Sequence, residues 1–318
     1  MIGIGIPTVG AGIRYLEFYI ENLLSLAAHP EQIRIYVTYH TKLDRKAIEV
    51  CSVYEHIYKA VYVQGSNEGL FWPSVNHSSA VNALASEIQE ETVIFSDYDM
   101  AFLKRGWDKV VSEKMEQFHL IGTPYVPVTF NGDMNVQILN EAIPWLKHAK
   151  LIKYQKLPNL TFMAIRKNTL DTIRDGRDLT NFGRFLMEGG LPFRLINSKI
   201  LADENNIPLG SLQWMDTGLE IPAMIEEHQL SYEVFGVRSL ESQGVLKKDL
   251  FTDNNVLLQP EFFYLEDEPF LMHFKKGTIK LRQATRDKYD NQFVVFKESI
   301  DEHIRNTDKT TPRLPVHS

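Results

Sequence analysis

The stretch "VIFSDYDMAFLKRGW", Val93 to Trp107, decides how the chain folds. It opens with apolar, strand-forming residues that run directly into Asp97 and Asp99, which have one residue between them. A strand that ends in this way places both carboxylates at the edge of a sheet. Two neighbouring carboxylates either share a hard divalent cation or belong to an ordinary polar turn. The segments on either side of the stretch bear on this choice.

Upstream of this stretch, expected strands and helices alternate. We expect strands at 1–7, 33–40, 59–65 and 91–97, and helices at 13–28, 45–57 and 74–88. This alternation predicts an α/β fold of the Rossmann-like type, with a central, mostly parallel sheet flanked by helices. Ligands of such sheets bind at the carboxyl ends of the strands. Asp97 and Asp99 follow the fourth strand, which favours the metal interpretation over the turn.

The pattern is less regular downstream. We expect helices at 106–118, 216–230 and 286–306, strands at 119–126, 231–237 and 270–274, and a strand entering a helix over 160–173. Residues 126–150 show no clear period and are interpreted as an elaborated surface loop. Residues 306–318 are expected to form a disordered tail.

The composition excludes several classes of protein. The chain of 318 residues is 44% hydrophobic and 24% charged, as in soluble globular proteins. No apolar run reaches the roughly 18 to 20 residues of a membrane span, and the start does not resemble a signal peptide. A net charge of -7 argues against a nucleic-acid partner. Because Cys51 is the single cysteine, no internal disulfide can form, and we expect a cytoplasmic location.

The glycine-containing start "GIGIPTVGAG" does not fit a dinucleotide-binding fingerprint. Thr8 stands where the third glycine of G-x-G-x-x-G belongs, and Pro7 lacks the backbone N-H that such a turn offers to a pyrophosphate. We expect Pro7 and Thr8 instead to shape a loop against a flat ligand such as a nucleotide base.

Two later segments also carry candidate chemistry. Asp216 precedes a predicted helix, so it is either the N-cap of that helix or a general base. Trp214 offers an aromatic face to a sugar ring or belongs to the core. In "FLMHFKKGTIKLR", His273 is either a structural histidine or a metal ligand, and lysines such as Lys276 either hold a diphosphate or lie in a solvated loop.

In this order the segments resemble the GT-A glycosyltransferases and, more loosely, their family 2 members. "IGIGIPTVG" looks like the nucleotide-binding first strand of these enzymes, and "NHSSAVNALASEIQEETVIFSDYDM" is similar to the helix and strand that carry their D-x-D motif. "MDTGLEIPAMIEEHQLSYEV" resembles their acidic motif and the helix after it. The resemblance covers roughly the first 110 residues, by the order of strand, helix and motif, and two short matches beyond them.

The resemblance implies a role for each matching residue. Asp97 would lie near the ribose and the metal, Asp99 would ligate the metal directly, and His273 would complete the metal site. Asp216 would be the catalytic base of an inverting enzyme, and Lys276 would contact the diphosphate. The remaining expected nucleotide contacts lie at strand ends and on the helix at 74–88: Pro7, Thr8, Tyr39 and Asn76.

The implied function is a metal-dependent transfer of sugar from a nucleoside diphosphate sugar to the hydroxyl of a carbohydrate or other acceptor. Mn²⁺ or Mg²⁺ is the implied metal, and UDP is expected rather than GDP. Residues 1–122 would bind the donor, and residues 123–305 would bind the acceptor in the same domain. Two alternatives stay open: a nucleotidyltransferase, although "TVGAGIRY" offers only Arg14 as a basic loop residue, and a non-catalytic module that binds sugar nucleotides or carbohydrate.

Overall fold

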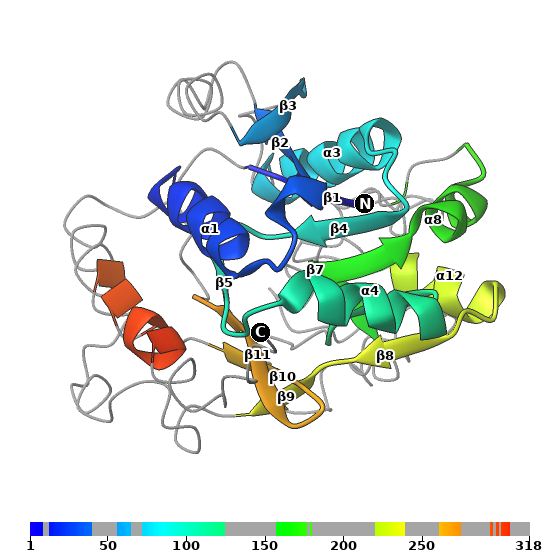
Figure 1. The fold of residues 1–318 in the computed structure, drawn as a ribbon. Helices are drawn as coiled ribbons and strands as arrows, with labels where there is room; N and C mark the ends of the chain where they lie inside the picture. The colour runs from blue at the N-terminus through cyan, green and yellow to red at the C-terminus, as the bar shows by residue number, and fades with distance from the viewer. Residues whose placement is uncertain are drawn as a thin grey trace, which may run out of the picture. The chain divides into compact units, whose positions relative to one another are not determined.

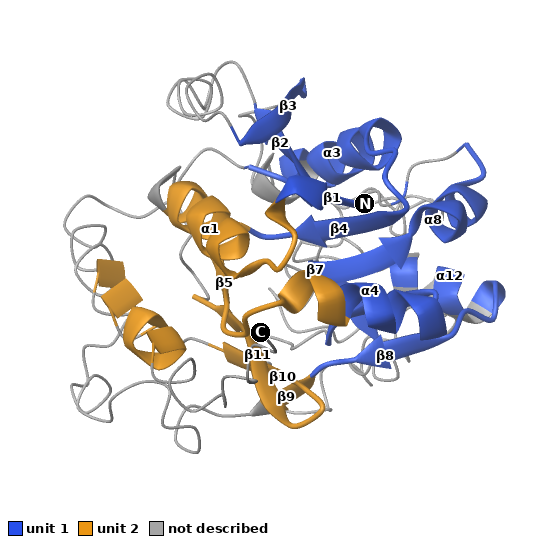
Figure 2. Cartoon of the chain, viewed as in Figure 1, with its two compact units in different colours: residues 1–10, 31–97, 111–235 blue, residues 11–30, 98–110, 236–318 orange. Residues whose placement is uncertain are grey.

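The structure is a computed structural model, in which part of the chain is described (Figure 1). The described residues are 1–8, 13–39, 56–64, 72–124, 157–176, 179, 220–238, 261–274, 293–294, 297–298 and 300–305. They group into two compact units (Figure 2): unit 1 comprises Met1–Gly10, Glu31–Asp97 and Val111–Phe235, and unit 2 comprises Ala11–Pro30, Tyr98–Val110 and Gly236–Ser318. The expected division at residue 122 is a functional one and stays a prediction.

Unit 1 contains a seven-stranded sheet with the strand order β3-β2-β1-β4-β7-β6-β8. Its strands are β1 (Ile2–Ile6), β2 (Ile33–Tyr39), β3 (Ile57–Tyr62), β4 (Thr92–Ser96), β6 (Leu120–Pro124), β7 (Pro158–Arg166) and β8 (Tyr232–Val234). The first four strands run parallel to one another, whereas β7 runs antiparallel to both β4 and β6. The expected α/β fold with a mostly parallel sheet is confirmed.

Three helices of unit 1 share one apolar core with this sheet: α3 (Trp72–Glu87), α8 (Lys167–Arg174) and α12 (Glu220–Glu227). The end of α3 comes very close to β1. A Cβ atom at Gly3 would lie 2.4 Å from Cγ2 of Ile88, and one at Gly5 would lie 2.9 Å from Cδ1 of Ile88. Both glycines therefore allow the helix to pack on the strand.

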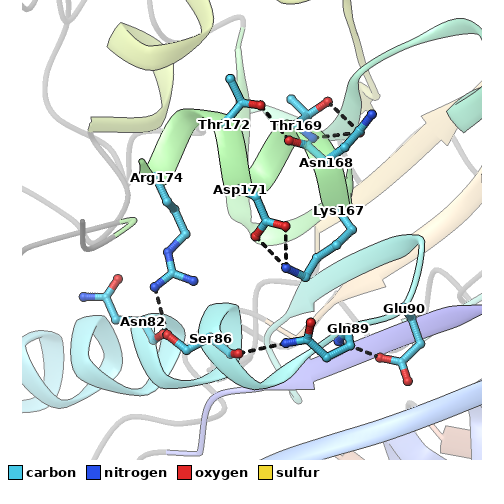
Figure 3. Close-up of polar contacts among 10 residues, drawn as sticks. All are labelled: Asn82, Ser86, Gln89, Glu90, Lys167, Asn168, Thr169, Asp171, Thr172 and Arg174. Atoms are coloured by element: carbon cyan, nitrogen blue, oxygen red, sulfur yellow. Dashed lines mark hydrogen bonds and ion pairs between the residues drawn. The ribbon is translucent and has the colours of Figure 1, made fainter. Parts of the chain in front are cut away.

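Polar contacts join α8 to α3 (Figure 3). The Arg174 guanidinium donates a hydrogen bond to the Ser86 hydroxyl at 2.8 Å, and the Gln89 side chain donates to the Ser86 carbonyl at 3.1 Å. The backbone N-H of Gln89 donates to the buried carboxylate of Glu90 at 3.2 Å. These bonds fix the turn between α3 and β4, which leads into the opening stretch.

Unit 2 contains α1 (Ile13–Leu26) and an antiparallel sheet with the strand order β5-β11-β10-β9. Its strands are β5 (Met100–Phe102), β9 (Gly236–Arg238), β10 (Glu261–Leu265) and β11 (Glu268–His273). The expected apolar face of α1 is largely buried, including Leu16, Tyr19 and Leu23. The other labelled elements are the 3-10 helix η1 (Pro30–Gln32) and α4 (Trp107–Gln117). The described residues at 293–294, 297–298 and 300–305 are helical, within the range of the helix expected at 286–306.

Several expectations differ from the structure or lie outside it. The single strand expected at 231–237 is two strands, because β8 joins the sheet of unit 1 and β9 joins the sheet of unit 2. β5 and β10 were not expected. The helix expected at 45–57 lies outside the described residues, except that His56 is in a turn and Ile57 begins β3. The loop expected at 126–150 also lies outside them. No helix in the described part of the chain is long and apolar enough to cross a membrane.

Candidate functional site

Polar side chains follow the carboxyl ends of β1 and β2 in unit 1. The Thr8 backbone N-H donates to the Thr38 hydroxyl at 3.0 Å, and the Thr8 hydroxyl donates to the Thr38 carbonyl. Both threonines are buried, as is Pro7. Tyr39 is partly exposed, and its ring centroid lies 5.7 Å from that of Tyr62 in β3. Tyr39 therefore keeps a surface that a ligand can contact, whereas Thr8 shapes the strand ends.

The first residues of α3 lie beside the end of β4. Asn76 is only 1% exposed. His77, which sequence reasoning did not single out, has its Nε2 atom 3.2 Å from Oδ1 of Asp97. The backbone N-H of Asp97 donates to the Thr161 carbonyl at 3.0 Å, so β7 fixes the position of the aspartate. In unit 1, the first of the two aspartates, Asp97, is thus paired with a histidine.

The second aspartate belongs to unit 2, where it lies beside the predicted late histidine. Asp99 is 2% exposed and directly precedes β5, whose Met100 is opposite His273 of β11. The backbone N-H of Phe274 donates to the Asp99 carbonyl at 2.8 Å. Oδ1 of Asp99 lies 3.3 Å from Nε2 of His273. The sheet of unit 2 therefore brings together two residues that are about 170 positions apart in the sequence.

The spacing of Asp99 and His273 fits two ligands of one cation. Adjacent ligands at ~2.1 Å in an octahedral shell lie about 3 Å apart, close to the observed 3.3 Å. A buried carboxylate also needs a partner for its charge. A set that contains an imidazole suits Mn²⁺ better than Mg²⁺, because Mg²⁺ is held almost entirely by oxygen.

A second carboxylate lies on the other side of the His273 ring. Oε2 of Glu261, in β10, lies 3.4 Å from Nδ1 of His273. Sequence reasoning missed Glu261 because it missed the hairpin of β10 and β11. The turn of this hairpin is Glu266-Asp267, both with positive φ (52° and 65°), and such turns are usually recognised by Asn-Gly or Asp-Gly.

The other expected site residues lie outside the described part of the chain. These are Trp214, Asp216 and Lys276. The base role of Asp216, the phosphate contact of Lys276 and the sugar-stacking role of Trp214 therefore stay predictions.

No protein-family model matches the chain, and no curated protein matches it. Similar solved structures include a mannosyltransferase from Pyrobaculum calidifontis in complex with GDP-Man and Mn²⁺, with 11% identity and a TM-score of 0.35 over 54% of this chain and 46% of that one. Residues 1–349 of S. aureus TarS match with 14% identity and a TM-score of 0.34 over 54% of this chain and 48% of that one. The chain thus spans less than half the length of these two proteins.

Mouse xyloside xylosyltransferase 1, in its apo form, matches over 73% of this chain and 83% of that one, with 12% identity and a TM-score of 0.38. TarS has also been solved in complex with UDP-GlcNAc. Two of these similar structures are named as sugar transferases, a mannosyltransferase and a xylosyltransferase. Because these identities and TM-scores are low, the function of this chain is inferred from its own site residues.

Proposed function

We propose that the chain is a metal-dependent glycosyltransferase, which moves a sugar from a nucleoside diphosphate sugar to an acceptor hydroxyl. The observation that carries this proposal is the pairing of Asp99 with His273. Asp99 lies three residues after the end of β4, the fourth of the parallel strands in chain order. Ligands of such sheets bind at the carboxyl ends of the strands. A metal and nucleotide role fits this place better than a polar turn does.

The proposed metal ligands are Asp97, Asp99 and His273, each of which offers one ligand atom. Asp97 is available to the same ion because one residue, Tyr98, separates it from Asp99, so that their Cα atoms lie within about 7 Å of each other. When bound, Mn²⁺ or Mg²⁺ supplies positive charge to the diphosphate that departs from the sugar. Asp97 also helps to place the donor ribose.

In this proposal, the nucleotide binds along the carboxyl ends of the strands of unit 1. Tyr39 offers its partly exposed ring to the base. Pro7, Thr8 and Asn76, which are buried, form the floor beneath it. A uracil base is expected rather than guanine.

The transfer itself would use two residues outside the described part of the chain. Asp216 accepts the proton of the acceptor hydroxyl, which makes that oxygen a better nucleophile. The oxygen then attacks the anomeric carbon from the side opposite the leaving diphosphate, which inverts the configuration of that carbon. Lys276 donates hydrogen bonds to the leaving diphosphate. The acceptor is a carbohydrate or another molecule with a free hydroxyl.

The test is to incubate the full chain with UDP-sugars and GDP-sugars and a set of carbohydrate acceptors, and to measure nucleoside diphosphate release with Mn²⁺ and with EDTA. We expect release that depends on Mn²⁺ and is lost on chelation. Asp99→Asn keeps the size of the side chain but removes a charged metal ligand. It should lower kcat/KM by about 100-fold or more, because the metal stabilises the negative charge on the leaving diphosphate.

The matched control is Asp171→Asn, which removes an exposed carboxylate that pairs with Lys167 on α8. This variant should retain wild-type activity, because exposed ion pairs contribute little. Transfer by Asp99→Asn at the wild-type rate would disprove the metal assignment. Exchange of pyrophosphate into a nucleoside triphosphate would identify a nucleotidyltransferase instead, and donor binding without turnover would identify a binding module.

A further inference from the structure

Glu261 is held next to His273 by the pairing of two strands. In the β10–β11 hairpin Glu261 lies directly opposite His273, and opposite residues of antiparallel strands present their side chains on the same face. Both side chains are largely buried, with exposed fractions of 16% and 14%. The close approach of Oε2 to Nδ1 at 3.4 Å is therefore fixed by the backbone of the sheet.

A β-bulge creates this register. From the turn onwards, Leu265 pairs with Glu268 and Tyr264 pairs with Pro269, but Phe263 pairs with Leu271, so one residue of β11 is left over. Without that extra residue, the regular register would place Met272 opposite Glu261. His273 would then lie one position further on, with its side chain on the other face. Bulges that re-aim one side chain are frequent beside functional sites.

The two sides of the His273 ring therefore have different neighbours. Nδ1 faces the carboxylate of Glu261, and Nε2 faces the carboxylate of Asp99. A carboxylate can only accept a hydrogen bond, so the contact with Glu261 requires a proton on Nδ1. When a cation takes the place between Nε2 and Asp99, a proton on Nδ1 leaves the lone pair of Nε2 available to bind that cation.

We propose that Glu261 is a positioning residue for the metal site, which accepts a hydrogen bond from Nδ1-H of His273 and so presents the Nε2 lone pair and Asp99 to the same cation. This inference rests on the proposed function, because it assigns Glu261 to the same metal site. The carboxylate also holds the ring against rotation and makes Nε2 a stronger ligand. Glu261 itself does not contact the metal.

The experiment measures Mn²⁺ binding to the full chain, with Mn²⁺ alone as the probe and no nucleotide present. Free Mn²⁺ is followed by electron paramagnetic resonance for the wild type, Glu261→Gln and Glu261→Ala. We expect both variants to raise the Kd for Mn²⁺ by about 10- to 100-fold, the usual effect of losing the carboxylate partner of a ligand histidine.

The matched control is Glu268→Gln in the same hairpin. Glu268 pairs with Lys104 on an exposed surface and does not approach the histidine ring. The Glu268→Gln variant loses the same charge from the same hairpin as Glu261→Gln but keeps the contact with His273. Its Kd for Mn²⁺ should therefore equal that of the wild type. A change shared by both glutamates would reflect net charge and would overturn the positioning role.

A second readout reports the tautomer of His273 directly. Nitrogen NMR of histidine-labelled protein, with the resonance assigned by its loss in His273→Gln, should show a protonated Nδ1 in the metal-free wild type. Glu261→Ala should shift the ring towards the Nε2-H form, while Glu268→Gln should not. Because this readout needs no metal and no turnover, it tests the positioning role even if the sugar-transfer proposal fails.

The outcomes separate the two proposals. If Glu261→Gln and Glu261→Ala bind Mn²⁺ as tightly as the wild type and keep Nδ1-H, the positioning role is wrong. If Asp99→Asn loses Mn²⁺ in the same experiment, the metal site nevertheless stands. If the Glu261 variants weaken Mn²⁺ binding but no sugar donor is turned over, the metal site with its positioning carboxylate stands and the glycosyltransferase proposal fails.

Discussion

Asn22 shows how one side chain can replace a strand. It lies in α1, and its amide donates to the carbonyl of Phe102 at 3.1 Å while its side-chain oxygen accepts the N-H of Phe102 at 2.6 Å. This is the pair of bonds that a neighbouring strand would supply to β5. The bonds hold the edge of β5, which directly follows Asp99.

We predict that Asn22→Ala lowers the free energy of unfolding by about 2 to 4 kcal/mol, because a buried N-H and a buried carbonyl both lose their partner. Urea denaturation followed by circular dichroism measures the change. Glu21→Ala, at the neighbouring exposed position of α1, should change it by less than about 0.5 kcal/mol. Equal midpoints for the two variants would show that Asn22 does not hold β5.

Periodicity explains why Asn22 could not be assigned this role from sequence. Its neighbours on the helix, Phe18, Tyr19 and Leu26, are all buried, so the 3.6-residue period places Asn22 on the buried face. The pattern therefore predicts a buried amide but cannot name its partner, which lies 80 positions away. The same holds for His77 and Asp97: each was visible in the sequence, and the contact between them was not.

At the scale of elements, the segment after β5 serves as the cap of α1. The Gly106 N-H donates to the Leu26 carbonyl at 2.7 Å, and the Trp107 indole N-H donates to the Leu23 carbonyl at 2.8 Å. These carbonyls are among the last four of the helix, and the Leu23 carbonyl also accepts the backbone N-H of Ala27 at 3.1 Å. Gly106 has φ of 71°, a value that few other residues adopt without strain.

Asp108 completes this cap from the first turn of α4. Its carboxylate accepts the backbone N-H groups of Ala28 at 2.7 Å and His29 at 2.8 Å. We predict that Asp108→Ala lowers the free energy of unfolding by about 2 to 4 kcal/mol, because two charge-assisted hydrogen bonds are lost in a buried place. Chemical denaturation provides the measurement.

Glu113→Gln on the exposed face of α4 is the matched control and should be nearly neutral. Asp108→Asn should lie between the two, since it keeps one accepting oxygen and loses the charge. A stability of Asp108→Ala equal to that of the Glu113 variant would contradict the capping role.

The elements that sequence reasoning missed share a physical cause. β10, "EFFYL", is buried at four of its five residues, so it shows no alternation that would separate a strand from a buried helix segment. β5 has three residues, all buried, which is too short for any period. By contrast, β1 to β4 and α3 were predictable because a parallel sheet requires long alternating units.

At the scale of the whole molecule, the order of the strands could be predicted only in part. Alternating strands and helices indicated a parallel sheet over the first half of the chain, and β1 to β4 form one. The antiparallel insertion of β7, and the change of sheet between β8 and β9, depend on pairings between distant segments. The role of Gly3 and Gly5 could not be predicted from the glycine motif either, because these glycines allow the close approach of Ile88 to β1.

Metal binding should stabilise the folded protein as a whole. A ligand that binds only the folded state raises its stability by mass action, about 2.7 kcal/mol at 100 times the Kd. For a protein of this size that corresponds to a rise in Tm of roughly 5 °C. We therefore predict that Mn²⁺ raises the Tm by about this amount in differential scanning fluorimetry, and that EDTA reverses the rise.

The variants decide where the stabilising ion binds. Asp99→Asn should show no rise with Mn²⁺, because the buried ligand next to His273 is lost, whereas Asp171→Asn should respond like the wild type. A rise of equal size in Asp99→Asn would place the stabilising ion elsewhere on this chain, whose net charge of -7 attracts cations without a built site. Repeating the titration at high salt separates these cases, since diffuse attraction is screened and coordination to a buried carboxylate is screened much less.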